Sequence, residues 1–162
     1  MVPYAGDDAF ILKAIKNLDP KKLDFDPNFY MYGGGLVYSA AMTLKIAEAF
    51  NIIKLKSGIA YYLEKPNEIG KIYYLLRILI VLFAIVGLIF LFYFIEKFHG
   101  VKFAYLTLII ILFNPETLIS SRVIEPHIFV LPFFLAAVYF AVKLIEFPKN
   151  NFLLIFYGLF SG

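Results

Sequence analysis

Two short polar stretches carry the side chains with the most obvious chemical potential. YAGDDAF, residues 4–10, places Asp7 and Asp8 next to each other, and SSRVIEPHIF, residues 120–129, contains Arg122, Glu125 and His127. Arginine is a fixed cation suited to phosphate, and imidazole titrates near neutral pH. A carboxylate can act as a base towards an acceptor hydroxyl, while an arginine or a metal ion stabilises a leaving phosphate. Together these residue types suit a lipid-phosphate substrate.

Each of these residues also has a structural interpretation, which the residue types alone leave open. Asp7 can cap a helix that follows it, with Asp8 favourably placed in the first turn. Arg122 and Glu125 stand three residues apart and can form a local ion pair. His127 by itself is typical of a satisfied interface residue.

The composition indicates that lipid is the solvent for most of the chain. Hydrophobic residues make up 62% of the 162 positions and charged residues only 17%, which would leave a soluble domain of this length with too much exposed apolar surface. The net charge of +3 comes from scattered lysines, so no nucleic-acid partner is expected. Cysteine is absent, which excludes disulfides and thiolate chemistry. The Gly33–Gly35 run lacks the following lysine of a phosphate-binding loop.

The first 71 residues are predicted to form an outer loop with interfacial helices. Residues 8–18 form a short amphipathic helix, since Ile11, Ile15 and Leu18 recur at helical spacing while lysines occupy the other face. Residues 36–55 are long enough to cross a bilayer, but they carry several charges that are unfavourable at mid-membrane. We therefore expect that segment to lie along the interface or to pack into the protein. Residues 56–71 are predicted to be a polar connector.

Residues 72–162 are predicted to be a membrane domain. Spans are expected at about 72–95, 103–121 and 128–146, with a truncated one from 151, and residues 96–102 form a short charged turn. Lysines flank the turns near 100 and 148, which places both turns in the cytoplasm by the positive-inside rule. The fold class is thus all-α, a polytopic membrane helix bundle. Both ends of the chain look like cuts through a larger protein.

The number of membrane crossings between the two polar stretches decides whether they lie on the same face. If residues 36–55 do not cross the membrane, Asp7 and Asp8 lie on the same outer face as Arg122, Glu125 and His127. This topology also requires a transmembrane helix before Tyr4 in the uncut protein. Arginine occurs only at Arg77 and Arg122; Arg77, near the start of its span, either joins this face or extends to lipid headgroups.

In order and spacing, these features resemble the integral-membrane GT-C glycosyltransferases of the protein mannosyltransferase and lipid A aminoarabinose transferase type. Gly6-Asp7-Asp8-Ala9-Phe10 matches the acidic pair of the first outer loop, and an aromatic-rich stretch follows at residues 28–32. Tyr73-Tyr74-Leu75-Leu76-Arg77-Ile78-Leu79 matches a helix that opens with an arginine. Residues 115–125, PETLISSRVIE, match the second outer motif, and residues 156–162 resemble the start of the next helix.

The resemblance implies an inverting glycosyltransferase of the cell envelope that uses a polyprenyl-phosphate sugar. The acceptor is a glycan, lipid or protein hydroxyl, and the site lies on the outer face of a multi-pass plasma-membrane protein. Asp7 then stands where the family keeps its proposed base, Asp8 in the neighbouring acidic position, and Glu125 where aspartate is common. Candidate residues for binding the substrate and its phosphate are Arg122, His127, Tyr32 and Arg77.

No cofactor is assigned beyond a candidate divalent cation, whose ligands the sequence leaves unknown. The chain by itself is expected to be inactive, because half of the donor cavity would be missing. The alternative is a non-enzymatic membrane segment of a transporter, a flippase or an assembly subunit. In that case Asp7 and Asp8 only cap a surface helix.

Overall fold

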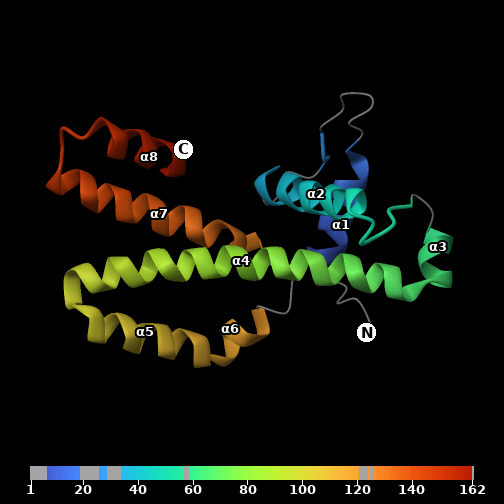
Figure 1. Cartoon of the computed structure of the whole chain (residues 1–162), viewed down its shortest axis with the longest axis horizontal. Coiled ribbons are helices and arrows are strands. Elements are labelled where there is room, and N and C mark those ends of the chain that lie inside the picture. Colours follow the sequence, from blue (N-terminus) through green and yellow to red (C-terminus); the bar gives the residue numbers. More distant parts are fainter. Residues whose placement is uncertain are drawn as a thin grey trace. The chain divides into compact units, whose positions relative to one another are not determined.

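A computed structural model describes residues 7–18, 26–28, 34–56, 59–120, 124 and 126–161. Helices account for most of these residues, and no strand occurs among them (Figure 1). The all-helical class predicted from the sequence is therefore confirmed for this part of the chain. The helices are α1 (Asp7–Asn17), α2 (Gly34–Ala49), α3 (Ile59–Glu64), α4 (Pro66–His99), α5 (Val101–Phe113), α6 (Pro115–Ser120), α7 (Pro126–Glu146) and α8 (Asn151–Ser161).

The chain forms two compact units, which are described separately. The first comprises Met1–Ile80 and Arg122–Pro126, and the second comprises Val81–Ser121 and His127–Gly162. The long helix α4 therefore contributes its first part to one unit and its remainder to the other.

In the first unit, α1 has the amphipathic character predicted for it. Ile11 and Ala14 are buried, whereas Lys13 and Lys16 are exposed. The helix begins one residue earlier than expected, so Asp7 is its first helical residue rather than the residue before it. At the C-terminal end of α1, the Asn17 Nδ2 donates a hydrogen bond to the Pro27 carbonyl at 2.9 Å. This bond ties the end of α1 to the loop that follows.

The ambiguous segment at 36–55 folds as α2, which packs against α1. Its buried face consists of small and aliphatic residues: Leu36, Val37, Ala40, Leu44 and Ala47. A helix of 16 residues is about 24 Å long, shorter than the roughly 30 Å hydrocarbon core of a bilayer. The structure thus agrees with the expectation of a packed helix.

The C-terminus of α2 is closed by a Schellman motif. Asn51 adopts a left-handed conformation, with φ of 57°. The Ile52 N–H donates to the Ala47 carbonyl, and the Asn51 N–H to the Glu48 carbonyl, each at 2.9 Å. Asparagine tolerates this conformation and is a common helix terminator. The motif explains why the helix stops well before Leu55.

The prediction of a polar connector at 56–71 was wrong, because most of that range is helical. It contains α3 and the first turns of α4. Pro66 is the first residue of α4, where its missing N–H needs no helical partner. Glu68 lies in the first turn, where a negative charge is favourable, and pairs with Lys71 at 2.7 Å. These are local helix-start signals that outweigh the polarity of the stretch.

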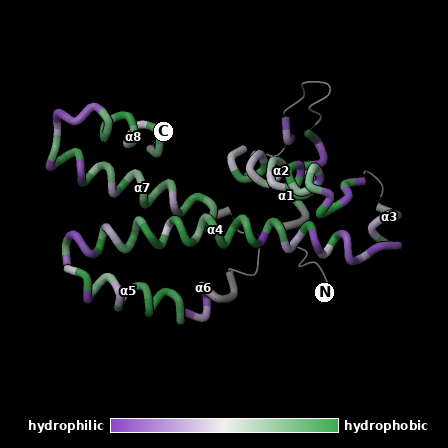
Figure 2. The backbone as a smooth tube through the Cα atoms, in the orientation of Figure 1, coloured by the Kyte–Doolittle hydropathy of each residue, from purple (hydrophilic) through white to green (hydrophobic). Residues whose placement is uncertain are grey.

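Two helices in the described part of the chain are long and apolar enough to cross a membrane. They are Pro66–His99 and His127–Glu146. Figure 2 shows the hydrophobic middle of α4 and the more hydrophilic residues at both of its ends. The first of these helices contains the span predicted at 72–95, and the second matches the one predicted at 128–146.

The span predicted at 103–121 is divided into two helices. α5 ends at Phe113, and α6 begins at Pro115. Proline lacks an N–H and disfavours a helical conformation in the residue before it, and Asn114 is extended with φ −69° and ψ 123°. The Asn114 Oδ1 accepts a hydrogen bond from the Glu116 N–H at 2.9 Å. At 13 residues, α5 is only about 20 Å long.

The charged turn predicted at 96–102 is reduced in the structure to Gly100. This residue has φ of 84°, a conformation that favours glycine, and helices adjoin it on both sides. Lys97 is not a loop residue: it lies in α4, and its Nζ is 2.5 Å from the Glu146 carboxylate at the end of α7. The charges therefore join two helices of the second unit.

Aromatic side chains pack α4, α7 and α8 together within the second unit. The ring centroids of Phe83 and Phe129 are 4.4 Å apart, and Phe140 stacks on Phe160 at 5.7 Å. The expected helix after residue 150 is present as α8. Asn150 Oδ1 accepts hydrogen bonds from the backbone N–H groups of Phe152 and Leu153, at 3.0 and 3.3 Å.

Candidate functional site

The predicted acidic pair opens α1. Asp7 and Asp8 are the first two residues of that helix. The structure describes their backbone but not their side chains. The N-terminus of a helix carries partial positive charge that favours carboxylates. The buried positions of α1 begin one turn later, at Ile11, so packing against α2 holds the helix that bears the pair.

Of the four residues predicted to bind substrate and phosphate, the structure describes Arg77 and His127. Arg77 lies in the part of α4 that belongs to the first unit, and its Nε atom is buried. Leu76 and Ile80 beside it are fully buried. His127 is exposed at the start of α7 and belongs to the second unit. Tyr32 and Arg122 lie outside the described residues, as does Glu125.

Ile124 is the described residue of the second polar stretch that bears on the site. It belongs to the first unit, the same unit as α1 and Arg77, and its side chain is fully buried. An aliphatic side chain buried to this extent fixes the position of its own backbone. Ile124 is thus packed within that unit.

No metal centre is evident among the residues that the structure describes. They contain no group of three or more His, Asp or Glu side chains arranged to hold an ion. The candidate divalent cation therefore stays a prediction whose ligands are unknown.

The first unit contains a pocket that the sequence did not predict. Its volume is about 370 Å³, within the usual range for small-molecule sites. Most of the lining is aliphatic, and three lysines and a tyrosine add polar groups. The lining residues are Leu12, Ile15, Lys16, Leu18, Leu44, Lys45, Leu55, Lys56, Tyr62, Ile69 and Ile72. They come from α1, α2, the segment after α2, α3 and the first turns of α4.

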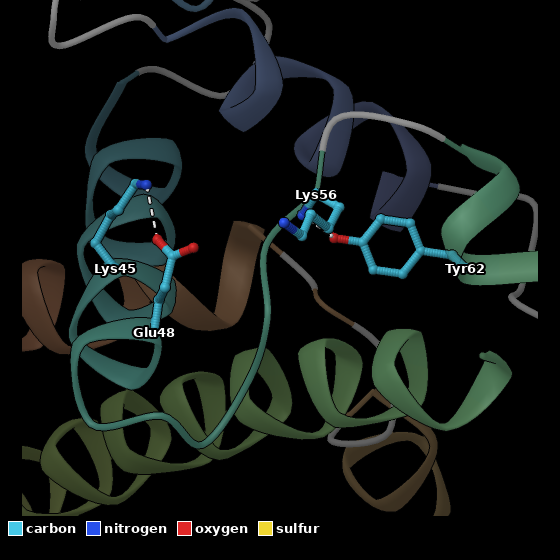
Figure 3. A network of polar contacts seen from close by, with 4 residues as sticks. All are labelled: Lys45, Glu48, Lys56 and Tyr62. Carbon is cyan, nitrogen blue, oxygen red and sulfur yellow. Dashed lines mark hydrogen bonds and ion pairs between the residues drawn. The ribbon is translucent and has the colours of Figure 1, made fainter.

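Two polar contacts hold the lysine side of this pocket (Figure 3). The Lys45 Nζ donates a hydrogen bond to the Glu48 Oε2 at 2.9 Å, and the Lys56 backbone N–H donates to the Tyr62 hydroxyl at 3.0 Å. The hydrogen bond from Lys45 lowers the pKa of the Glu48 carboxyl, and partial desolvation opposes this effect. Glu48 is therefore a carboxylate at neutral pH, and it is already engaged with Lys45.

The three lysines of the pocket are far apart in sequence, so no sequence motif predicted that they line one pocket. Lys16 is one of the lysines that helical spacing places on the polar face of α1, and Lys45 is one of the charges that are unfavourable for membrane crossing in residues 36–55. Packing of α1 on α2 brings both lysines to the pocket, where the chain after α2 adds Lys56.

No protein-family model, curated protein or solved structure matches the chain. The resemblance to GT-C glycosyltransferases therefore rests on the order and spacing of its motifs.

Proposed function

We propose that this sequence belongs to a membrane glycosyltransferase that moves a sugar from a polyprenyl phosphate to an acceptor hydroxyl. Transfer takes place on the outer face of a multi-pass plasma-membrane protein. The acceptor is a glycan, a lipid or a protein. Two helices apolar enough to span a bilayer support a membrane location, and the GT-C-like motifs support the chemistry.

The burial of Ile124 is the observation that carries the proposal. The two acidic motifs are separated by more than a hundred residues, yet Ile124 packs into the compact unit that also contains α1 and Arg77. A shared site requires residues of both polar stretches in one compact unit, and the position of Ile124 supports this for the part of the second stretch before His127.

In the proposed reaction, Asp7 accepts the proton of the acceptor hydroxyl as its oxygen attacks the anomeric carbon from the face opposite the phosphate. The bond from that carbon to the polyprenyl phosphate breaks, and the phosphate leaves with the electron pair, so the sugar is inverted. Arg122 and Arg77 stabilise the charge on the leaving phosphate. Asp8 and Glu125 supply further negative charge, and Tyr32 belongs to the wall of the site. His127 is a candidate from the sequence alone, since it belongs to the second unit.

The decisive test is Asp7→Asn in the protein as its gene encodes it, assayed in membranes for transfer from a polyprenyl-phosphate sugar. Loss of a general base lowers turnover by about 10²- to 10⁴-fold, and we expect a loss in that range. Asp26→Asn is the matched control, because Asp26 is exposed and an asparagine retains the oxygen that accepts the Asn28 N–H at 2.8 Å.

Full transfer activity in a correctly inserted Asp7→Asn variant would remove Asp7 as the base. Equal losses in the Asp7 and Asp26 variants would show a general effect of charge instead. If the membranes show no transfer from any polyprenyl-phosphate sugar, the alternative role in a transporter, flippase or assembly subunit is favoured.

A further inference from the structure

The pocket of the first unit is suited to an amphiphile with a negative charge. Its wall is mainly aliphatic, with Leu12, Ile15, Leu44 and Ile72 among the lining residues. An apolar cavity of this kind tends to exclude water and to accept apolar groups. Lys16, Lys45 and Lys56 line the same pocket, and none of the described lining residues is acidic.

Two of these lysines are available to a ligand. Lys45 is paired with Glu48 at 2.9 Å, whereas Lys16 and Lys56 take part in no ion pair with another described residue. Both are exposed, and a lysine can lay its aliphatic chain along an apolar wall while its ammonium group stays at the polar boundary. The pocket thus joins an apolar interior to a cationic edge.

The surface of the same unit indicates where such a ligand would come from. Large apolar side chains are exposed on it, including Met42 at 66%, Phe50 at 74% and Leu63 at 76%. Apolar exposure on a unit with an amphipathic helix is typical of contact with a membrane interface. The long apolar helix α4 starts in this unit as well.

We infer that this pocket binds an anionic membrane phospholipid, with an acyl chain among the aliphatic residues and the phosphate next to Lys16 and Lys56. Arg77 and His127, the proposed transfer residues whose side chains the structure describes, do not line this pocket. The inference concerns lipid binding beside α1 and α2, and it stands whether or not the protein is a transferase.

Native mass spectrometry of the full chain in detergent tests this directly. Phosphatidylglycerol and phosphatidylcholine with identical acyl chains are offered at equal concentration. We expect selective retention of phosphatidylglycerol. Each lysine near an anionic lipid surface contributes roughly fivefold in affinity, so Lys16→Gln combined with Lys56→Gln should remove most of the preference.

Lys13→Gln combined with Lys54→Gln is the matched control. Lys13 lies in α1 and Lys54 in the segment after α2, as Lys16 and Lys56 do. Both control lysines are exposed, but they do not line the pocket. We expect the control to keep its preference for phosphatidylglycerol. Ile15→Trp, which fills the apolar wall, should reduce retention of both lipids while leaving the helical circular dichroism unchanged.

Three results would overturn the inference. Equal retention of the two lipids would show ordinary annular binding, and equal losses in the pocket and control variants would show general surface attraction. Displacement of the lipid by millimolar inorganic phosphate alone would show a free-anion site in place of a lipid site.

Discussion

At the scale of single residues, the ion pair between Lys45 and Glu48 couples folding to pH. The hydrogen bond from Lys45 lowers the pKa of Glu48 from its ordinary value of 4.5. A carboxyl whose pKa falls on folding stabilises the folded state fully above its unfolded pKa, and this stabilisation is lost as pH falls through the lowered value. An exposed pair of this kind contributes about 0.2–1 kcal/mol.

Glu48→Gln should therefore lower the thermal stability of the chain in detergent by that small amount at pH 7. The difference from the wild type should vanish once the pH is below the lowered pKa. Glu64→Gln, at an exposed position on α3, is the control and should change little at either pH. A Glu48 effect that persists in acid would mean that the side chain acts through packing rather than through its charge.

The sequence predicted residues well where one element determines their environment. Helical spacing identified the apolar side of α1, where Ile11 is buried and Ile15 and Leu18 are half-buried. It also placed the acidic pair at the start of the helix, with the boundary one residue too late. Lys16 and Lys56 show the opposite case, since their shared pocket exists only after four helices and the segment after α2 have packed together. The spacing of two residues in a sequence does not show whether the fold brings them to the same pocket.

At the scale of elements, Gly87 sets how closely α4 approaches α7 in the second unit. A Cβ atom at this position would lie 3.4 Å from Leu131 Cγ and 3.4 Å from the backbone nitrogen of Pro132. A methyl group fits at that distance, but a larger side chain does not. Gly87→Ala should leave thermal stability unchanged or raise it by up to about 1 kcal/mol, whereas Gly87→Leu should lower it by about 1–3 kcal/mol.

Gly70 offers a matched control in the same helix. A Cβ atom there meets nothing within 4 Å, so Gly70→Leu should be tolerated. Thermal unfolding in one detergent, followed by circular dichroism, compares all three variants. Equal destabilisation by leucine at both positions would show that α4 responds to the lost glycine itself, and would remove the close approach to α7 as the cause.

Helices were predicted most accurately where a long apolar run or a strong amphipathic pattern defined them, as for α1, α4 and α7. The errors lay at boundaries. Polar residues at 56–71 and 96–102 suggested loops, but Pro66 begins a helix and Lys97 finds its partner on α7. Conversely, an apolar run hid the break that Pro115 imposes. Hydropathy reports the surroundings of a segment, whereas proline, asparagine and ion pairs decide where its helices begin and end.

At the scale of the whole molecule, the proposed site requires both polar stretches to lie on one side of the membrane. At 16 residues α2 is too short to cross a bilayer by itself, and at 13 residues α5 is shorter still. If α4 crosses, residues 7 and 125 share a face only if the segment of α5 and α6 crosses as well. The charges of α2 indicated that α2 does not cross. The sequence could not predict that α5 is short, because the break at Asn114 depends on local backbone geometry.

The absence of cysteine makes this topology directly measurable by single-cysteine labelling in intact cells. Gly6→Cys and Ser121→Cys place a thiol beside each polar stretch without removing a proposed site residue, and Lys149→Cys reports the turn between α7 and α8. We expect a membrane-impermeant maleimide to label the first two positions from outside and the third only after permeabilisation. Labelling of positions 6 and 121 from opposite sides would exclude a shared site, because no side chain crosses roughly 30 Å of hydrocarbon.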